Sequence, residues 1–446
     1  MKKVGKDINL EEDMKHTKNY FILISICFLI VFSFASCNKD KNKTTEREIG
    51  LAEDTMNNNK AEYSKNSDIK NEENKQKENN FEDIKPEEIK PEETNAEEKL
   101  EAAPLSIRDI SSTELIKELK IGWNLGNTLD AVGGALLNSE MSWGNPSTKE
   151  EMFIAVKEAG FNIIRIPVSW ESHLGPEPDY IIHKAWLDRV NEVVDYAIDN
   201  ELYVILNLHH EEWHFPSYDN LDKSEAILIK VWTQIADRFK DYDEHLIFEG
   251  MNEPRMKNTP QEWTGGNPEA WDVINQLNHS FIETIRNSGG NNKLRHLMIP
   301  PYAASSDPKT WKDLIVPEDD KVIVSIHAYT PYNFALNIKG TAKWSPESAN
   351  DTRDIDSLMD NLYNSFVSKG QPVILGEFGA IDKDNLEDRV LWSEYYIKKS
   401  KEIGVPCIWW DNGAFIGNGE LFGLLDRRKG EWQHPEIIEA LMRAFE

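Results

Sequence analysis

Residues 202–208 read LYVILNL, a short apolar run that ends directly before His209 and His210. A run of this length and composition is typical of a buried β-strand. Seven further runs of the same kind occur beyond residue 105. The eight predicted strands are Lys120 to Leu125, Asn162 to Ile166, Leu202 to Leu208, Leu246 to Met251, His296 to Ile299, Val322 to Ile326, Val373 to Gly376 and Pro406 to Trp410.

Amphipathic stretches separate these runs. Residues 185–198 read AWLDRVNEVVDYAI, and their apolar residues recur three and four positions apart, which predicts a helix. Apolar strands that alternate with helices predict a parallel sheet covered by helices. Eight such units within residues 105–446 favour a closed (β/α)8 TIM barrel, and a doubly wound open sheet is the alternative.

Polar and aromatic residues gather at one end of the predicted strands. In chain order they are Asn127, Arg165, His209, His210, Asn252, Glu253, Tyr302, His327, Tyr329, Glu377, Trp410, Asp411 and Asn412. Active sites of TIM barrels lie at the carboxyl ends of the strands. This placement therefore favours the barrel and locates a candidate site.

Two carboxylates in this set are predicted to lie across the barrel mouth from each other. Glu253 follows the fourth run and precedes Pro254, and Glu377 ends the seventh run between glycines. A carboxylate at the end of a buried strand has either a structural ion pair or a chemical role. Two carboxylates facing each other suit glycosidic cleavage, which requires one proton donor and one ionised group.

Eight sequence motifs occur in order along the whole predicted barrel. They are GWNLGNTLD at 122–130, WGNP at 143–146, IRIPVSW at 164–170, LHHE at 208–211, NEP at 252–254, HAY at 327–329, GEFG at 376–379 and WWDNG at 409–413. With these motifs, the chain from about Lys120 to Leu441 resembles glycoside hydrolase family 5, most closely its endoglucanase and xyloglucanase members.

The resemblance implies a retaining mechanism in a (β/α)8 barrel. Glu377 would be the nucleophile, Glu253 would be the general acid and base, and Asn252 would hold the 2-hydroxyl of the reacting sugar. The residues expected to bind or support the substrate are Asn127, Arg165, His209, His210, Asn252, His327, Tyr329 and Trp410. Either Trp409 or Trp410 would be the sugar platform, and the polar turn after Trp410 favours Trp410.

The tryptophans in loops after the strands have two interpretations. They are Trp143, Trp170, Trp213, Trp344 and Trp410. Exposed aromatic faces stack on pyranose rings, so such residues are either sugar subsites or anchors of their loops. As a set, they favour a polymeric ligand.

No metal or cofactor is expected. His209 and His210 could suggest zinc, but neighbouring strand residues point to opposite faces and a zinc site requires three or four converging ligands. Cys407 lies in an apolar run, which favours a packing role over a catalytic thiol.

The first 104 residues have a different composition. An apolar run from Tyr20 to Ala35 leads to the lipobox-like Phe34-Ala35-Ser36-Cys37, so residues 1–37 are predicted to be a signal peptide with lipidation at Cys37. An uncleaved anchor or an ordinary signal peptide is the alternative. Residues 38–104 are charged and poor in aromatic residues, and they are predicted to be a disordered acidic linker.

These features together predict an exported enzyme of a bacterial cell envelope, lipid-anchored through Cys37, facing outward and monomeric. The net charge of −28 over 446 residues disfavours nucleic-acid binding. The expected activity is a retaining endo-β-1,4-glucanase acting on cellulose, xyloglucan or mixed-linkage glucan. The alternatives are a β-mannanase or xylanase on the same scaffold, and a non-catalytic surface glycan-binding lipoprotein.

Overall fold

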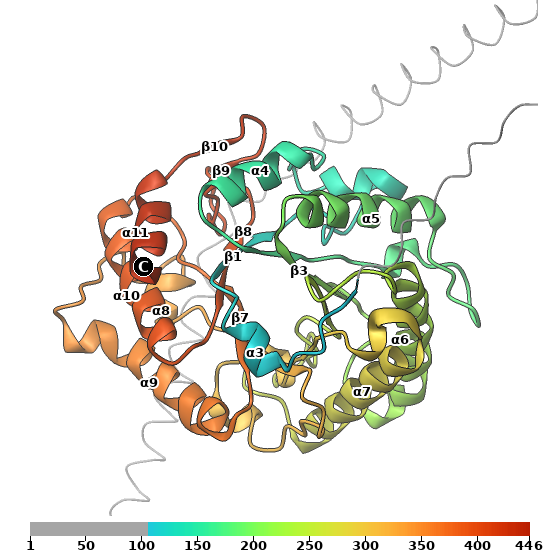
Figure 1. Cartoon of the computed structure of the whole chain (residues 1–446). Helices are drawn as coiled ribbons and strands as arrows, with labels where there is room; N and C mark the ends of the chain where they lie inside the picture. The colour runs from blue at the N-terminus through green and yellow to red at the C-terminus, as the bar shows by residue number, and fades with distance from the viewer. Residues whose placement is uncertain (1–105) are drawn as a thin grey trace, which may run out of the picture. The chain divides into compact units, whose positions relative to one another are not determined.

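Each of the eight apolar runs forms a parallel strand in the computed structural model, which describes residues 106–446 (Figure 1). The strands are β1 (Ile121–Leu125), β2 (Ile163–Ile166), β3 (Tyr203–Asn207), β4 (Leu246–Glu249), β5 (Leu297–Ile299), β6 (Val322–His327), β7 (Val373–Phe378) and β8 (Cys407–Asp411). Strand β1 pairs with both β2 and β8, so the sheet closes into a barrel. The (β/α)8 prediction is confirmed, and the open-sheet alternative is wrong.

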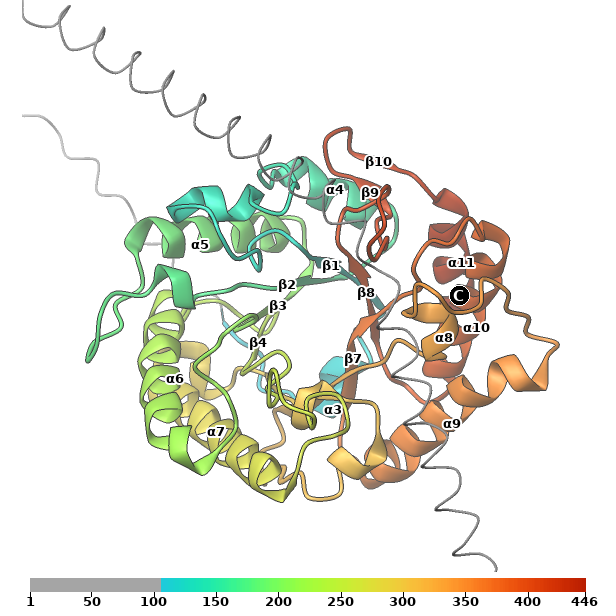
Figure 2. The ribbon, with the colours of Figure 1, turned by 180° about the vertical axis from the view of Figure 1, so that it is seen from behind.

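Helices surround the strands, as Figure 2 shows from behind. They are α3 (Ser112–Ile116), α4 (Glu150–Glu158), α5 (Lys184–Asp199), α6 (Tyr218–Arg238), α7 (Pro268–Asn287), α8 (Tyr332–Ala335), α9 (Ala349–Ser365), α10 (Leu386–Glu402) and α11 (Pro435–Phe445). A hairpin of two short strands, β9 (Leu425–Asp426) and β10 (Glu431–Trp432), follows β8. The ends of several helices follow simple local rules. For α7, the Asn267 side chain accepts a hydrogen bond from the backbone N–H of Ala270, and Pro268 occupies the first turn.

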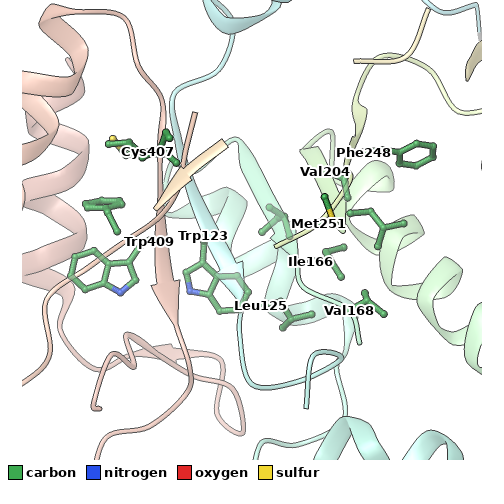
Figure 3. Packing of buried hydrophobic residues seen from close by; sticks show 14 of the residues in the cluster. Trp123, Leu125, Ile166, Val168, Val204, Phe248, Met251, Cys407 and Trp409 are labelled. Carbon is green, nitrogen blue, oxygen red and sulfur yellow. The ribbon is translucent and has the colours of Figure 1, made fainter. Parts of the chain in front are cut away.

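The outward face of the barrel packs against the helices and forms the main core. Along each strand, successive side chains point to opposite faces, so one residue in two enters this layer. Trp123 and Leu125 on β1, Phe248 on β4 and Trp409 on β8 belong to it, and all are fully buried (Figure 3). The alternating pattern therefore leaves the other set of strand residues to fill the barrel interior.

The amino-terminal end of the barrel interior is apolar and is covered by α3. The inward side chains there are Ile163, Tyr203, Ile205, Ile247, Met298, Ile323, Ile374 and Ile408. Leu115, Ile116 and Leu119 pack on them, and Figure 1 shows α3 across this end of the barrel. A capping box between Ser111 and Glu114 starts the short helix. Helix α3 therefore seals the end of the barrel opposite to the candidate site.

The predicted signal segment, Cys37 and the linker at 38–104 lie outside the described residues. Within residues 106–446, no helix combines the length and apolar character that a membrane crossing requires. Cys407 is a buried free cysteine, and burial raises the pKa of its thiol to about 12, as its predicted packing role requires.

We expect Leu115→Ala to destabilise the barrel by about 3 kcal/mol, because it opens a cavity in a sealed apolar layer. Lys117→Ala changes an exposed position of the same segment and should leave stability within about 0.5 kcal/mol of wild type. Urea unfolding followed by tryptophan fluorescence measures both values. Equal midpoints for the two variants would show that α3 is not part of the cooperative unit.

Candidate active site

Above the apolar layer that α3 covers, the next layer of inward-pointing side chains is polar. Because side chains alternate along every strand, the next inward positions of neighbouring strands meet at one level of the barrel. These positions hold Asn124, Arg165, Asn207, Glu249 and Ser325, and all five side chains are fully buried. Buried polar groups need partners, so this layer has to be a connected network.

Arg165 on β2 is at the centre of that network. Its Nε donates to Glu249 on β4 at 2.8 Å, and its Nη1 donates to Glu377 on β7 at 2.9 Å. Further bonds go to Asn124 Oδ1 at 3.0 Å and to Asn252 Oδ1 at 2.7 Å. Burial alone would lower the pKa of Arg165, but the charges of Glu249 and Glu377 raise it. Arg165 therefore stays a cation and ties β1, β4, β7 and the loop after β4 to its own strand, β2.

Glu249 receives two more bonds inside the barrel. Asn207 Nδ2 donates to it at 3.0 Å, and Ser325 Oγ donates to it at 2.5 Å. These donors hold Glu249 as the inner counterion of Arg165, away from the cleft.

Glu377 has a donor for each of its carboxylate oxygens. Oε1 accepts from Arg165, and Oε2 accepts from the hydroxyl of Tyr329 at 2.7 Å. Burial and the charge of Glu377 raise the pKa of Tyr329 well above its usual value, so Tyr329 stays a protonated donor. The carboxylate of Glu377 is thus held in one orientation.

A register shift between β6 and β7 brings His327 to this carboxylate. The pairing moves by one residue after Ile326. His327 therefore lies opposite Glu377, and Gly376 is paired with no residue of β6. A Cβ atom on Gly376 would lie 3.1 Å from His327 Nε2. Glycine at this position therefore leaves room for the imidazole.

Glu253 lies in the loop after β4 and faces the same imidazole. Its Oε1 is 2.8 Å from His327 Nδ1, and its Oε2 is 3.5 Å from Arg255 Nη1. His327 Nδ1 is also 3.6 Å from Glu377 Oε1. An oxygen of Glu253 and an oxygen of Glu377 lie within 4.8 Å of each other. Separations of about 5 Å between two carboxyl groups are those of double-displacement glycosidases, whereas inverting enzymes keep them roughly 6.5–9.5 Å apart.

The Glu253 and His327 side chains share one proton. Burial would raise the pKa of Glu253, but the hydrogen bond and charge of His327 lower it below its usual value. Burial would lower the pKa of His327, but Glu377 and the bond to Glu253 raise it. Although Arg165, 3.5 Å from His327 Nε2, opposes it, these two directions favour a proton on His327 Nδ1, one hydrogen bond away from Glu253.

The remaining predicted side chains line the wall on the β3 and β8 side. His209 is parallel to Trp410 with ring centroids 5.7 Å apart, and His210 lies edge-on to His209 at 4.5 Å. Burial lowers the pKa of both histidines, that of His210 to about 4, so both are neutral. Asn252 is fixed at its backbone and at its side chain. Its backbone N–H donates to the Leu208 carbonyl, and its side-chain oxygen accepts from Arg165.

The two adjacent tryptophans of β8 have different surroundings. Trp409 is fully buried in the outer layer, where its Nε1 donates to the Phe422 carbonyl. Trp410 is on the other face of the strand and packs beside Ile381 and Phe422. Only Trp410 is next to His209 and the cleft.

Asn127 contributes through a turn after β1. The Asp130 carboxylate accepts the backbone N–H groups of Asn127 and Thr128, and Asn145 donates to the Asn127 carbonyl. Ligand atoms of Asp130, His209 and His210 come within 4.8 Å of one another. However, both Asp130 oxygens and His209 Nδ1 already have hydrogen-bond partners, so this set is poorly suited to a cation.

The loop tryptophans divide into two groups. Trp170, Trp213 and Trp344 are buried and anchor their loops. Trp143 is 42% exposed and lies 5.5 Å from the His210 ring. With Arg255, Lys257 and other residues from the loops after β1 to β4, it lines a cavity of about 560 Å³ beside Glu253.

Glu249 is part of the site although it was not among the residues predicted from the sequence. Glu249 stands two residues after Ile247, which points into the barrel, so the period of two could have assigned it to the interior. Arg255 was also missed, because its contact with Glu253 depends on loop conformation.

Comparison with known proteins places this geometry in a family. Residues 128–415 match "Cellulase (glycosyl hydrolase family 5)". A cellulase/esterase of Acetivibrio thermocellus is 50% identical over 76% of this chain, which spans 41% of that protein's length. Endoglucanase A of Ruminococcus albus is 47% identical, covering 75% of this chain and 93% of the relative.

A solved structure agrees with both sequence relatives. It is a GH5-4 broad specificity endoglucanase from Ruminococcus champanellensis with bound cellotriose. It is 50% identical with a TM-score of 0.74, covering 75% of this chain and 99% of the other. The chain therefore belongs to glycoside hydrolase family 5, the cellulase family.

Proposed function

We propose that this chain is a retaining endo-β-1,4-glucanase that hydrolyses cellulose, xyloglucan or mixed-linkage glucan. The observation that carries the proposal is the pair of carboxylates within 4.8 Å at the ends of β4 and β7, each with different partners. The relatives with endoglucanase names and the cellotriose bound in a structure of the same family support a β-glucan substrate.

Glu377 is the nucleophile in this proposal. Its carboxylate attacks the anomeric carbon, an ester bond forms, and the glycosidic bond to the leaving oxygen breaks. Arg165 and Tyr329 orient the carboxylate for this attack. Both donors are already in place, so little reorganisation is needed as the reaction proceeds.

Glu253 transfers the proton. It protonates the leaving oxygen in the first step, with the proton supplied across the 2.8 Å contact from His327. In the second step the resulting carboxylate takes a proton from water, and the hydroxide oxygen displaces Glu377 from the anomeric carbon. Two displacements return the original anomeric configuration.

The surrounding residues bind the reacting sugar. With its oxygen held by Arg165, Asn252 directs its amide N–H₂ to the 2-hydroxyl. Trp410 provides an aromatic face, and the neutral His209, His210 and the turn at Asn127 complete the polar wall.

We also propose export and lipidation at Cys37, with a monomeric enzyme facing outward from a bacterial envelope. The apolar run and lipobox-like residues at 34–37 support this. Metabolic labelling with a fatty-acid probe, lost in Cys37→Ala, tests the lipid anchor.

Substitution of each carboxylate should have a different signature. Glu377→Gln should lose several orders of magnitude in kcat on every substrate, because the nucleophile is missing. Glu253→Gln should lose about 10²–10⁴-fold in kcat/KM on cellopentaose. It should retain most of its kcat/KM on 2,4-dinitrophenyl β-cellobioside, whose leaving group needs no proton. Circular dichroism controls for folding, and a near-wild-type Glu377→Gln enzyme would refute the proposal.

The pH profile should depend on the leaving group. The pKa of His327 is raised above its usual 6.5, so the pair keeps its proton at pH 6.5 and loses it as the pH rises through that raised value. On cellopentaose, kcat/KM should therefore decline above pH 6.5, whereas 2,4-dinitrophenyl β-cellobioside should show no such alkaline decline. Identical alkaline limbs for the two substrates would assign that limb to another group.

A further inference from the structure

Trp263 has the most exposed indole in the described part of the chain. Its side chain is 68% exposed on the loop that follows β4 and carries Glu253. Most tryptophans of the domain are buried in the core or anchor loops, whereas Trp263 presents its ring to solvent next to Arg255, which contacts Glu253. An exposed aromatic face close to a glycosidic site is suited to stack on a pyranose ring.

The loop keeps its shape through contacts that do not involve the Trp263 indole. Met256 N–H donates to the hydroxyl of Tyr302 at 3.0 Å, and that hydroxyl donates to the Glu262 carbonyl at 3.0 Å. Trp271 Nε1 donates to the Gly265 carbonyl at 2.7 Å. Removal of the Trp263 side chain should therefore leave the loop in place.

Arg255 connects the indole to Glu253. Its guanidinium lies 4.4 Å from the centre of the Trp263 ring, and its Nε donates to Glu262 at 3.1 Å. Its Nη1 donates to the Glu253 carbonyl at 3.2 Å and lies 3.5 Å from the Glu253 carboxylate. One face of the indole is thus covered by a cation that touches the proton-transferring residue.

We propose that Trp263 is a platform for the leaving-group part of the glycan, and that Arg255 is a positioning residue that couples this platform to Glu253. The inference rests on the proposed function, because Glu253 marks the leaving-group side of the cleaved bond. A sugar that stacks on the open face of Trp263 fixes the indole and, through Arg255, the orientation of the Glu253 carboxylate.

The platform is tested by comparing two substrates. Trp263→Ala should lower kcat/KM on cellopentaose about three- to tenfold, the usual range for loss of one aromatic contact. It should leave kcat/KM on β-cellobiosyl fluoride within about twofold of wild type, because that leaving group is one atom and reaches no platform. Trp263→Phe should restore most of the loss. Tyr363→Ala removes an exposed aromatic ring on α9 and should change neither substrate.

The coupling is tested with Arg255. Arg255→Gln should lower kcat/KM on cellopentaose but not on 2,4-dinitrophenyl β-cellobioside, which needs no proton from Glu253. Arg255→Lys should recover part of the activity. In a double-mutant cycle, Trp263→Ala is combined with Arg255→Gln. The kcat/KM of this double variant on cellopentaose should lie within about twofold of that of the less active single variant.

Three results would overturn the inference. Equal losses of Trp263→Ala on cellopentaose and on β-cellobiosyl fluoride would indicate a structural role for the indole. Unchanged activity on cellopentaose would exclude a platform, and strictly additive losses in the cycle would exclude coupling. Each of these results is compatible with an inactive Glu377→Gln enzyme, so they are separate from a failure of the proposed function.

Discussion

The buried charge of Arg165 is the constraint on which the site depends. A cation in a barrel interior is strongly unfavourable unless anionic partners are present at hydrogen-bond distance. Glu249 supplies one charge from below and Glu377 supplies the other at the cleft. The salt bridge that makes Arg165 tolerable therefore also fixes the nucleophile candidate. Removal of either carboxylate would leave a charge imbalance in the interior, so stability and chemistry share the same contact.

This polar layer explains why the other end of the barrel is so apolar. The inward layer near α3 consists mainly of isoleucine, with Leu115 of the helix packed into it. Burial of such a layer stabilises the fold by about 25 cal/mol per Å² of apolar surface. This stabilisation offsets the free-energy cost of burying the polar layer above it. The barrel thus divides its interior into a stabilising half and a reactive half. Both halves belong to one sheet, because the strands that carry the apolar half also carry the polar half.

The fold and the two central carboxylates could be predicted from sequence because both depend on local patterns. The strand ends predicted from the apolar runs lie within two residues of the observed ends. Strand position alone placed Glu253 and Glu377 at the carboxyl-terminal rim of the barrel. The position of His327 between them could not be predicted, because it depends on a register shift after Ile326 that no local pattern encodes. The contact of Arg255 with Trp263 likewise depends on loop conformation.

The two carboxylates differ in how they are held, and this difference matches their proposed roles. Glu377 is on a strand and is fixed by Arg165 and Tyr329, neither of which gives up its proton readily. Glu253 is on a loop and is held by His327, an imidazole whose pKa is raised by Glu377 and by the bond to Glu253 itself. A nucleophile benefits from rigid donors, whereas a residue that must gain and lose a proton requires a partner that can do the same. The division of labour thus follows from which element carries each carboxylate and from the acidity of its neighbours.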